Sequence, residues 1–469
     1  MLGETEIVEK FLGTNLQVHP DVVRYLRESD NPSSLFDEIL THVPPDALVV
    51  LPHHIPGWKP ETDGMRFLAD PHLDVIYGKA VIAKSGVDFR DFTYFFKNRY
   101  EKLSGMLKSR GESIPISALT QTTRYRQVDC TITGMVVEVR NTGKGHRMAL
   151  LEDPTDTINV LFNNKRDVFE DAEKLIPDEV ILVKGQLSND GNLFFASSLH
   201  RPDIPINHAP FKSETPGKVV MISDVHVGSN TFLTEAWDSF SDWLPESDAR
   251  YLLIAGDLVD GIGIYPGQEK ELTIPDIYEQ YDAFGEMLSA LPSDMEIVIS
   301  PGNHDAVRGA EPQPALAGEF IRKFPDNVTL VENPAMVNLQ GVRVLLYHGR
   351  SYDDMISMIP GATYTHPEVM MQEMLIRRNL TCTYGMRTPI FPTKEDRMII
   401  DPIPEILLTG HVHISGIVNY RGVLCVNPGT WQSQTSFQKQ MNIQPTPAMA
   451  VVVDLQTMKP EVFDFSGDL

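Results

Sequence analysis

The sequence has 469 residues, and at roughly 100–200 residues per domain this length predicts several domains. An apolar content of 42% is enough to bury a sizeable core and excludes a chain that is disordered throughout. The 40 Lys and Arg residues stand against 64 Asp and Glu residues, which gives a net charge of −24. Any contact with nucleic acid therefore requires a local basic patch, a bound metal or a partner subunit.

The cysteines and the N-terminal sequence bear on the compartment. The three cysteines, Cys130, Cys382 and Cys425, are widely spaced and favour neither a disulfide framework nor a thiolate zinc site. The first ten residues lack the basic start and the apolar run of a signal peptide. Because no run of about 18 apolar residues occurs, we expect no membrane segment. The few, widely spaced cysteines favour a reducing, cytoplasmic location.

Three segments are expected in the first 120 residues. In chain order they are a helical N-terminal region at 1–45, a Pro-rich linker at 46–71 and a strand-helix segment at 72–120. In the first, one helix opens at Pro20 and a second spans 34–42. In the third, a strand pair over 75–84 precedes a helix over 89–110, whose aromatic residues are expected to pack inward.

Residues 121–205 have the pattern of a small β-barrel. Five short β-like runs are separated mostly by Gly and Asn turns, and one helical stretch, 165–175, follows the third run. The runs are 128–140, 147–152, 158–162, 180–187 and 193–196. Five strands with a helix after the third are typical of an OB-fold, although another small barrel or a sandwich remains an alternative. Phe162, Phe194 and Phe195 either stack bases or fill the core of this segment.

Residues 217–469 alternate apolar strands with helical segments. The strand-like runs are 218–223, 251–255, 296–300, 342–347, 405–408, 423–426 and 449–453. Strands that are apolar almost throughout imply a sheet buried on both faces, with helices packed against it. The expected fold class is therefore a multidomain α/β plus β protein: a small helical region, an OB-fold barrel and an α/β sandwich.

Polar side chains follow five consecutive strands of this last domain, usually beside a glycine. The segments are DVHVG from 224, GDLVDG from 256, PGNHD from 301, HG from 348 and GHVH from 410. Any one of them is more typical of a turn or a structural histidine than of a site. All five together predict a single site, because ligands bind at the carboxyl ends of strands in such sheets. The candidate ligands are Asp224, His226, Asp257, Asn303, His348, His411 and His413.

These donors are carboxylate, amide and imidazole groups without a thiolate, a set that suits two divalent ions such as Mn²⁺, Zn²⁺ or Fe²⁺. The order DxH, GDxxDG, GNHD, HG and GHxH resembles the calcineurin-like metallophosphoesterases, including the Mre11-type nucleases. An OB-like segment ahead of such a domain resembles the B-subunits of replicative DNA polymerases. The spellings SDVHVGS, GDLVDGIG, PGNHD, YHGRS and LTGHVH make the chain similar to the small subunits of archaeal family D DNA polymerases.

The resemblance implies a role for each motif residue. The first metal would be held by Asp224, His226, Asp257 and His413. The second would be held by Asp257, Asn303, His348 and His411, with Asp257 bridging the two ions. Mn²⁺ is expected, with Mg²⁺, Zn²⁺ or Fe²⁺ as alternatives. His304 would contact the scissile phosphate or protonate the leaving 3′-oxygen, and Asp260 and Asp305 would either orient a ligand histidine or close a turn.

The resemblance also implies a 3′–5′ exonuclease that acts on single-stranded or mismatched DNA ends and supports the large catalytic subunit of a polymerase. One alternative is a scaffold with a vestigial site, which the complete ligand set disfavours. Another is a free-standing phosphatase or cyclic-nucleotide phosphodiesterase, in which the OB-like segment would have no obvious function. Five basic residues are predicted either to contact DNA phosphates or the large subunit or to lie on a solvated surface. They are Arg377, Arg378, Arg387, Lys394 and Arg397.

Overall fold

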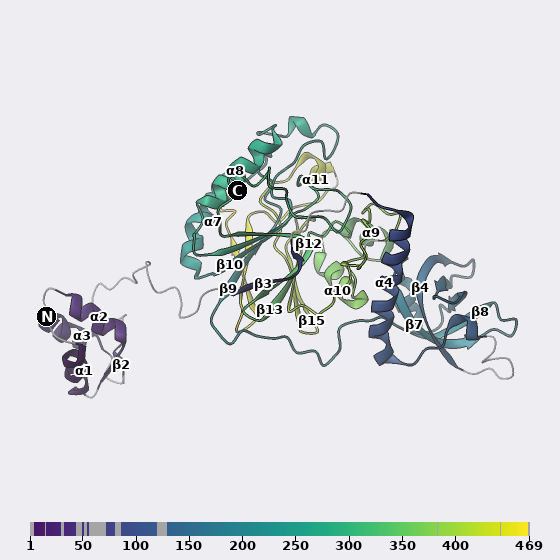
Figure 1. The fold of residues 1–469 in the computed structure, drawn as a ribbon, viewed down its shortest axis with the longest axis horizontal. Helices are drawn as coiled ribbons and strands as arrows, with labels where there is room; N and C mark the ends of the chain where they lie inside the picture. The colour runs from purple at the N-terminus through teal and green to yellow at the C-terminus, as the bar shows by residue number, and fades with distance from the viewer. Residues whose placement is uncertain are drawn as a thin grey trace. The chain divides into compact units, whose positions relative to one another are not determined.

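The structure, a computed structural model, divides into two compact units, residues 1–68 and 69–469 (Figure 1). It describes residues 4–14, 16–29, 32–43, 49–50, 54–55, 72–79, 86–119, 129–381, 383–440 and 442–467. Within these ranges, no helix is both long enough and apolar enough to cross a membrane.

The described part of the first unit has three helices and two short parallel strands. They are α1 (Glu4–Leu12), β1 (Gln17–Val18), α2 (Pro20–Glu28), α3 (Pro32–His42) and β2 (Val49–Val50). As predicted, α2 begins at Pro20, because proline has no N–H to leave unpaired in the first turn of a helix. Val50 and Ile55 fall in the predicted linker 46–71 but are buried in the core of this unit. The pairing of β2 with β1 brings this stretch into the fold.

The second unit begins with β3 (Leu73–Lys79), which differs from the strand pair predicted over 75–84. β3 is a single strand that pairs antiparallel with β12 (Val328–Leu339) of the large sheet. Residues 80–85 of the predicted pair lie outside the described residues. The strand-helix segment 72–120 therefore contributes to the sheet of the α/β domain as well as leading into the barrel.

The aromatic helix predicted over 89–110 is α4 (Phe89–Leu107), followed by the short 3₁₀ helices η2 (Lys108–Arg110) and η3 (Ile116–Ala118). A capping box between Asp88 and Asp91 stabilises the N-terminus of α4. Phe95 packs into the core of the α/β domain, whereas Leu103 packs against the barrel. The helix thereby joins the two domains.

A closed five-stranded barrel follows α4, with the strand order β4-β5-β6-β8-β7. Its elements are β4 (Cys130–Asn141), β5 (Arg147–Glu152), β6 (Thr157–Phe162), α6 (Val168–Glu173), β7 (Val180–Leu187) and β8 (Leu193–His200). The closed barrel and the helix after the third strand confirm the OB-fold. Phe162 and Phe194 lie fully buried in the barrel core, while Phe195 is 46% exposed.

Eleven strands of the described chain form one sheet: β3 beside β12, and the others in the order β15-β16-β14-β13-β12-β11-β10-β9-β17-β18. The strands not yet given are β9 (Lys218–Ile222), β10 (Tyr251–Ala255), β11 (Glu296–Ser300), β13 (Val342–Leu346), β14 (Ile406–Leu408), β15 (Gly416–Tyr420), β16 (Val423–Asn427), β17 (Met449–Asp454) and β18 (Lys459–Asp464). β9, β10 and β11 run parallel to one another, as do β13, β14 and β16. The carboxyl ends of the strands in each set therefore lie together.

Helices cover both outer faces of this sheet (Figure 1). The helical elements are α7 (Thr234–Trp243), η4 (Leu244–Ser247), η5 (Gln268–Lys270), α8 (Ile277–Ser289), α9 (Tyr352–Met358), α10 (Pro367–Arg377) and α11 (Ser436–Gln440). α7 and α8 pack on the strands around β10, and α9 and α10 pack on those around β13. A third cluster of side chains, almost all from the strands, fills the space between the two halves of the sheet. The predicted sheet buried on both faces, in an α/β sandwich, is confirmed.

Candidate metal centre

The candidate ligands lie where the sequence analysis placed them, in the loops that follow β9, β10, β11, β13 and β14. Glycines allow these loops to approach one another closely. A Cβ atom on Gly302 would collide with the Asp257 carboxylate, and one on Gly256 would lie 2.5 Å from His348 Nδ1. Only glycine fits at these two positions without displacing a candidate ligand.

The backbone of the candidate ligands is itself unusual. Five of the seven have positive φ angles: Asp224 (54°), His226 (56°), Asp257 (50°), His411 (73°) and His413 (59°). Residues other than glycine rarely adopt this region, and each instance costs on the order of 1–3 kcal/mol. The fold thus maintains local strain at the positions that direct these side chains toward one point.

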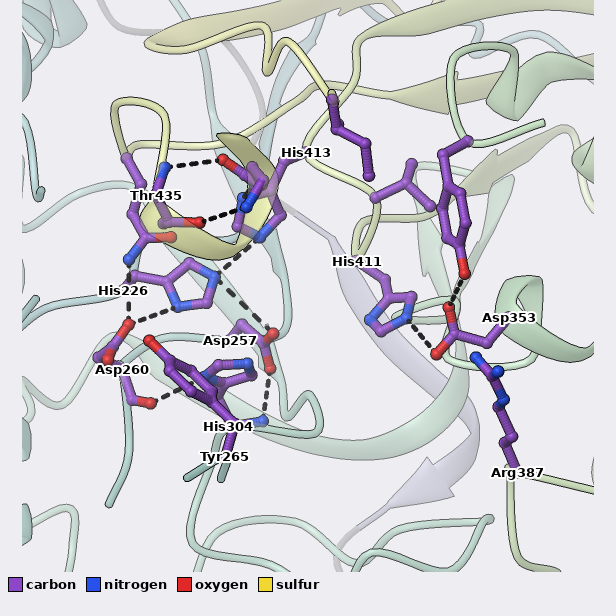
Figure 2. A pocket seen from close by; sticks show the side chains of 15 residues that line it. His226, Asp257, Asp260, Tyr265, His304, Asp353, Arg387, His411, His413 and Thr435 are labelled. Atoms are coloured by element: carbon purple, nitrogen blue, oxygen red, sulfur yellow. Dashed lines mark hydrogen bonds and ion pairs between the residues drawn. The ribbon is translucent and has the colours of Figure 1, made fainter. Parts of the chain in front are cut away.

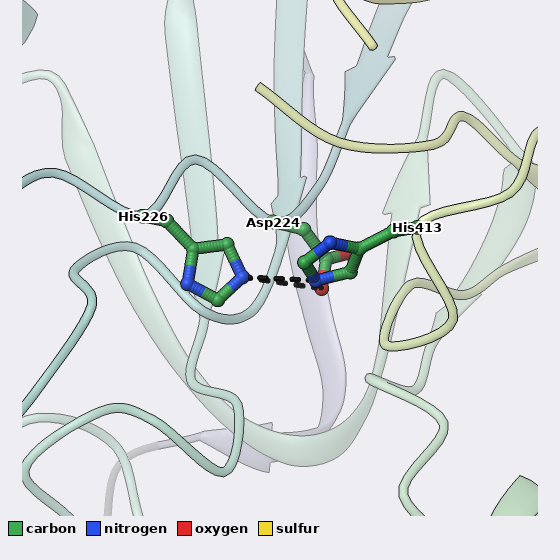
Figure 3. Close-up of side chains that lie close together, drawn as sticks. All are labelled: Asp224, His226 and His413. Carbon is green, nitrogen blue, oxygen red and sulfur yellow. Dashed lines mark hydrogen bonds and ion pairs between the residues drawn. The ribbon is translucent and has the colours of Figure 1, made fainter. Parts of the chain in front are cut away.

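The first cluster comprises Asp224, His226 and His413 (Figure 3). The Nε2 atoms of the two imidazoles are 3.0 Å apart. Asp224 Oδ1 lies 3.3 Å from His413 Nε2 and 3.9 Å from His226 Nε2. All three side chains are buried, with Asp224 completely so. Three donor atoms therefore converge on one point beneath the surface.

The second cluster comprises Asp257, His348 and His411, with Asn303 beside it. His348 Nε2 lies 3.2 Å from Asp257 Oδ2 and 3.0 Å from Asn303 Oδ1. The same Asp257 Oδ2 atom is 3.8 Å from His226 Nε2 of the first cluster. The other oxygen, Oδ1, accepts a hydrogen bond of 2.8 Å from the backbone N–H of His304. One carboxylate oxygen thus faces both clusters, while the second holds the carboxylate in place.

These donor separations fit bound divalent ions. Ligand bonds of about 2.0–2.2 Å place neighbouring donors roughly 3–3.6 Å apart around one ion. The closest pairs in the first cluster, 3.0 and 3.3 Å, fall in this range, as do those in the second, 3.0 and 3.2 Å. The donor chemistry, carboxylate and amide oxygens with imidazole nitrogens, suits the same ions.

Carboxylates and imidazoles in the clusters shift one another's pKa values. Burial alone would raise the pKa of Asp224, but the facing His226 and His413 hold it below its ordinary value. Burial opposes charge on His226 as well, yet Asp224 and Asp260 raise its pKa to about 10. His348 follows the same pattern, with a pKa raised to about 9 by Asp257. Burial prevails at His413 and lowers its pKa, so the buried carboxylates favour positive charge at His226 and His348.

His304 is on the wall of a cavity that is lined by residues of both clusters, among them His226 and His411 (Figure 2). This cavity has a volume of about 290 Å³. The Nδ1 atom of His304 is 2.7 Å from the backbone oxygen of Asp260, so Nδ1 donates and Nε2 is the free ring nitrogen. Burial lowers the pKa of His304. His304 also lines a second cavity, together with Asn303.

Asp260 and Asp305 have different surroundings. The two roles predicted for them were to orient a ligand histidine or to close a turn. Asp260 Oδ1 is 3.3 Å from His226 Nδ1, and its carboxylate accepts hydrogen bonds from Gln268 and Gln432. It is placed to orient His226. Asp305 accepts from the backbone N–H of Gly302 and from the hydroxyl of Tyr281 on α8, and so fastens the loop instead. Burial and the Asp257 charge raise the pKa of Asp305 to about 7.

Two of the five basic residues predicted to contact DNA or the partner are buried, which corrects that prediction. Arg377 is 1% exposed and forms ion pairs with Glu373 of the same helix and with Glu179 of the barrel domain. Arg378 is 5% exposed and donates to the backbone oxygen of Ile400. Both lie at the end of α10, where Arg377 faces Glu179 of the barrel domain and Arg378 faces Ile400 and Asp401. They are neither surface contacts nor part of a solvated face.

The other three basic residues lie nearer the surface. Arg397 is partly exposed and pairs with Glu332. Lys394 is exposed. Arg387 is exposed too, and it lines the cavity that both clusters share (Figure 2). Of the five, Arg387 is therefore the one that the structure brings to the site.

Several residues of this cavity were not predicted from the sequence. They include Tyr265, Asp353, Tyr364, Gln432 and Gln438. Gln438, on the short helix α11, lies 2.8 Å from His413 Nδ1. The segment YHGRSYDD does contain Asp353, five residues after His348, but nothing in that spacing distinguishes it from an ordinary helix start. The tyrosines and glutamines belong to no recognisable sequence motif.

Comparison with known proteins agrees with the fold and the site. The calcineurin-like phosphoesterase family model matches residues 217–427, and the OB-fold nucleic acid binding domain model matches residues 130–197. The phosphoesterase match implies divalent metal ions and indicates phosphoester hydrolysis.

Curated relatives match between 77% and 97% of the chain. The DNA polymerase II small subunit of Halobacterium salinarum is 41% identical over 92% of this chain and 84% of its own length. That of Methanothermobacter thermautotrophicus is 37% identical over 97% of this chain and 98% of its own length. That of Archaeoglobus fulgidus is 44% identical over 77% of this chain and 74% of its own length. With an OB-fold barrel followed by a calcineurin-like phosphoesterase domain, the chain belongs to the family of archaeal DNA polymerase II small subunits.

Proposed function

We propose that this protein is the 3′–5′ exonuclease subunit of a two-subunit archaeal DNA polymerase and that it hydrolyses single-stranded or mismatched DNA ends with two divalent cations. The observation that carries the proposal is the place of Asp257. One of its oxygens faces His226 in one cluster and His348 in the other. A carboxylate shared between two neighbouring donor sets is the arrangement that two-metal phosphodiester hydrolysis requires.

The assignment of ligands follows the clusters. The first cation would be held by Asp224, His226, Asp257 and His413. The second would be held by Asp257, Asn303, His348 and His411. Such cations supply Lewis acidity and an activated water to phosphoester hydrolysis. Mn²⁺ is the first candidate, since oxygen donors are mixed with imidazoles.

The remaining chemistry belongs to His304. Its backbone N–H donates to Asp257, which holds the main chain, and its Nδ1 donates to the Asp260 carbonyl, which orients the ring. Nε2 is left to contact a phosphate oxygen or to deliver a proton to the leaving 3′-oxygen. Arg387, at the cavity wall, supplies a cation for the DNA backbone. A cavity of about 290 Å³ is small even for a ligand pocket, which favours a strand end over a duplex.

The relatives are named small subunits, which supports a complex with a large catalytic subunit in the cytoplasm. In that complex, polymerisation belongs to the partner, and this chain adds the nuclease site and a scaffold. A purely vestigial scaffold would not need a complete set of converging donors. A free-standing phosphoesterase would not need a barrel joined to its α/β domain through α4.

Digestion of labelled single-stranded DNA by the copurified two-subunit complex tests the proposal. With Mn²⁺, we expect 5′-labelled strands to shorten stepwise from the 3′ end. Asp257→Asn should lower the rate by at least about 10³-fold, since it removes the charge shared by both cation sites. Asp242→Asn, an exposed aspartate on α7, is the matched control and should digest normally. Unimpaired digestion by Asp257→Asn, or no digestion by the wild type, would refute the proposal.

A further inference from the structure

The histidines of the two clusters do not all use the same ring nitrogen for their contacts outside the clusters, and His411 is the exception. His226, His348 and His413 each have Nδ1 engaged and Nε2 directed at the cluster. Those Nδ1 atoms contact Asp260 Oδ1 at 3.3 Å, as an ion pair, the Ala255 carbonyl oxygen at 2.9 Å and the Gln438 amide nitrogen at 2.8 Å. In His411 the outward nitrogen is Nε2, which lies 3.5 Å from Asp353 Oδ2.

Asp353 is itself held in place. Its Oδ1 accepts a hydrogen bond of 2.8 Å from the hydroxyl of Tyr364. Each carboxylate oxygen therefore has its own partner, Tyr364 on one side and His411 on the other. Figure 2 shows the His411 ring standing between Asp353 and the Asp257 side of the cavity. The Asp353 side chain is 28% exposed and sits in the first turn of α9.

This contact decides how His411 can bind a cation. An imidazole that binds a metal through one nitrogen donates a hydrogen bond through the other, and the acceptor fixes the tautomer and the ring orientation. With Nε2–H directed at Asp353, Nδ1 is the nitrogen left to face Asp257 and His348. The His411 backbone is held separately, by its N–H to the Asp224 carboxylate at 3.0 Å. The ring orientation, by contrast, depends on Asp353.

We infer that Asp353, supported by Tyr364, is a positioning residue that sets His411 for the second cation and controls the affinity of that cation separately from the first. The inference rests on the metal centre of the proposed function but does not depend on DNA as the substrate. Asp260 has the equivalent task at the first cluster, toward His226. Each cation site thus has one carboxylate outside its ligand set.

Mn²⁺ titration of the purified full chain by calorimetry, with metal content measured on the same samples, tests this inference. Asp353→Asn should weaken the second Mn²⁺ by about 10–100-fold and leave the first unchanged. Tyr364→Phe should weaken it by a few-fold. Because the ligands themselves are intact, the DNA digestion rate of Asp353→Asn should approach that of wild type at saturating Mn²⁺.

A matched pair of controls lies away from the clusters. The Tyr420 hydroxyl donates to Asp203 at 2.9 Å, the same kind of contact as that between Tyr364 and Asp353. Asp203→Asn and Tyr420→Phe should bind both cations with wild-type affinity. Circular dichroism of all variants establishes that each is folded.

The outcomes separate the inference from the proposed function. Wild-type affinity for both cations in Asp353→Asn, or loss of both cations together, overturns the role of Asp353. If the wild type binds two cations but digests no DNA, the nuclease proposal fails while the inference stands on the binding data. If the wild type binds fewer than two cations, both fail.

Discussion

Removal of the His304 imidazole should separate chemistry from cation binding. In His304→Ala the backbone N–H that donates to Asp257 Oδ1 is kept, so the shared carboxylate stays in place. Only the ring between the Asp260 carbonyl and the cavity is lost. A positioned acid–base group contributes about 10²–10⁴-fold to a rate. This corresponds to roughly 2.7–5.4 kcal/mol of barrier at about 1.36 kcal/mol per tenfold, and we expect a fall in kcat of that size.

Asn303→Ala provides the contrast, since it is the neighbouring residue and a proposed ligand. Its Oδ1 atom lies 3.0 Å from His348 Nε2, in the second cluster. Loss of this neutral donor should weaken the second cation, so excess Mn²⁺ should restore part of the activity. His304→Ala should keep two cations and should not respond to excess Mn²⁺.

Initial rates on 5′-labelled single-stranded DNA and metal content, measured on the same preparations, check both variants. A His304→Ala rate within a few-fold of wild type would show that the histidine is only structural. Loss of a cation from His304→Ala, or its rescue by Mn²⁺, would show that His304 is a ligand and that the assigned role is wrong.

Three further predictions concern stability and organisation. Arg377→Gln removes one cation from a buried group of charges in which Glu179 keeps Arg201 and Glu373 keeps Lys174, so urea unfolding should show a loss of about 1–3 kcal/mol, whereas DNA affinity of the folded variant should not change; reduced affinity at full stability would contradict this. Chelation should lower the Tm, because a cation at about 100 times its Kd adds about 2.7 kcal/mol; an unchanged Tm would contradict tight binding. Deletion of residues 1–68 should leave pull-down of the large subunit and cation content intact, and complete loss of binding would assign the partner interface to the first unit.

Sequence patterns predicted the barrel and much of the sheet because local apolar content determines those strands. The runs at 147–152, 180–187, 251–255 and 296–300 coincide with β5, β7, β10 and β11. The missed strands have weaker patterns. β12 contains Asn333 and Pro334, and proline cannot donate within a ladder. β18, at one edge of the sheet, carries Lys459, Pro460 and Glu461, residues that suit an edge but resemble a loop.

The candidate ligands could be predicted because each follows an apolar strand, and a parallel arrangement brings such positions together. Arg377 and Asp353 illustrate what that reasoning cannot reach. The burial of Arg377 depends on Glu179, which the barrel contributes from 198 positions earlier in the chain. The contact of Asp353 with His411 joins α9 to the loop after β14. Neither contact leaves a periodicity or a motif in the sequence.

Anomalous X-ray scattering from crystals of the protein soaked in Mn²⁺ would locate the cations themselves. We expect two peaks roughly 3.5–4 Å apart, one beside Asp224 and His413, the other beside His348 and His411, with the Asp257 carboxylate between them. A single peak, or two peaks that do not share Asp257, would contradict the two-cation centre.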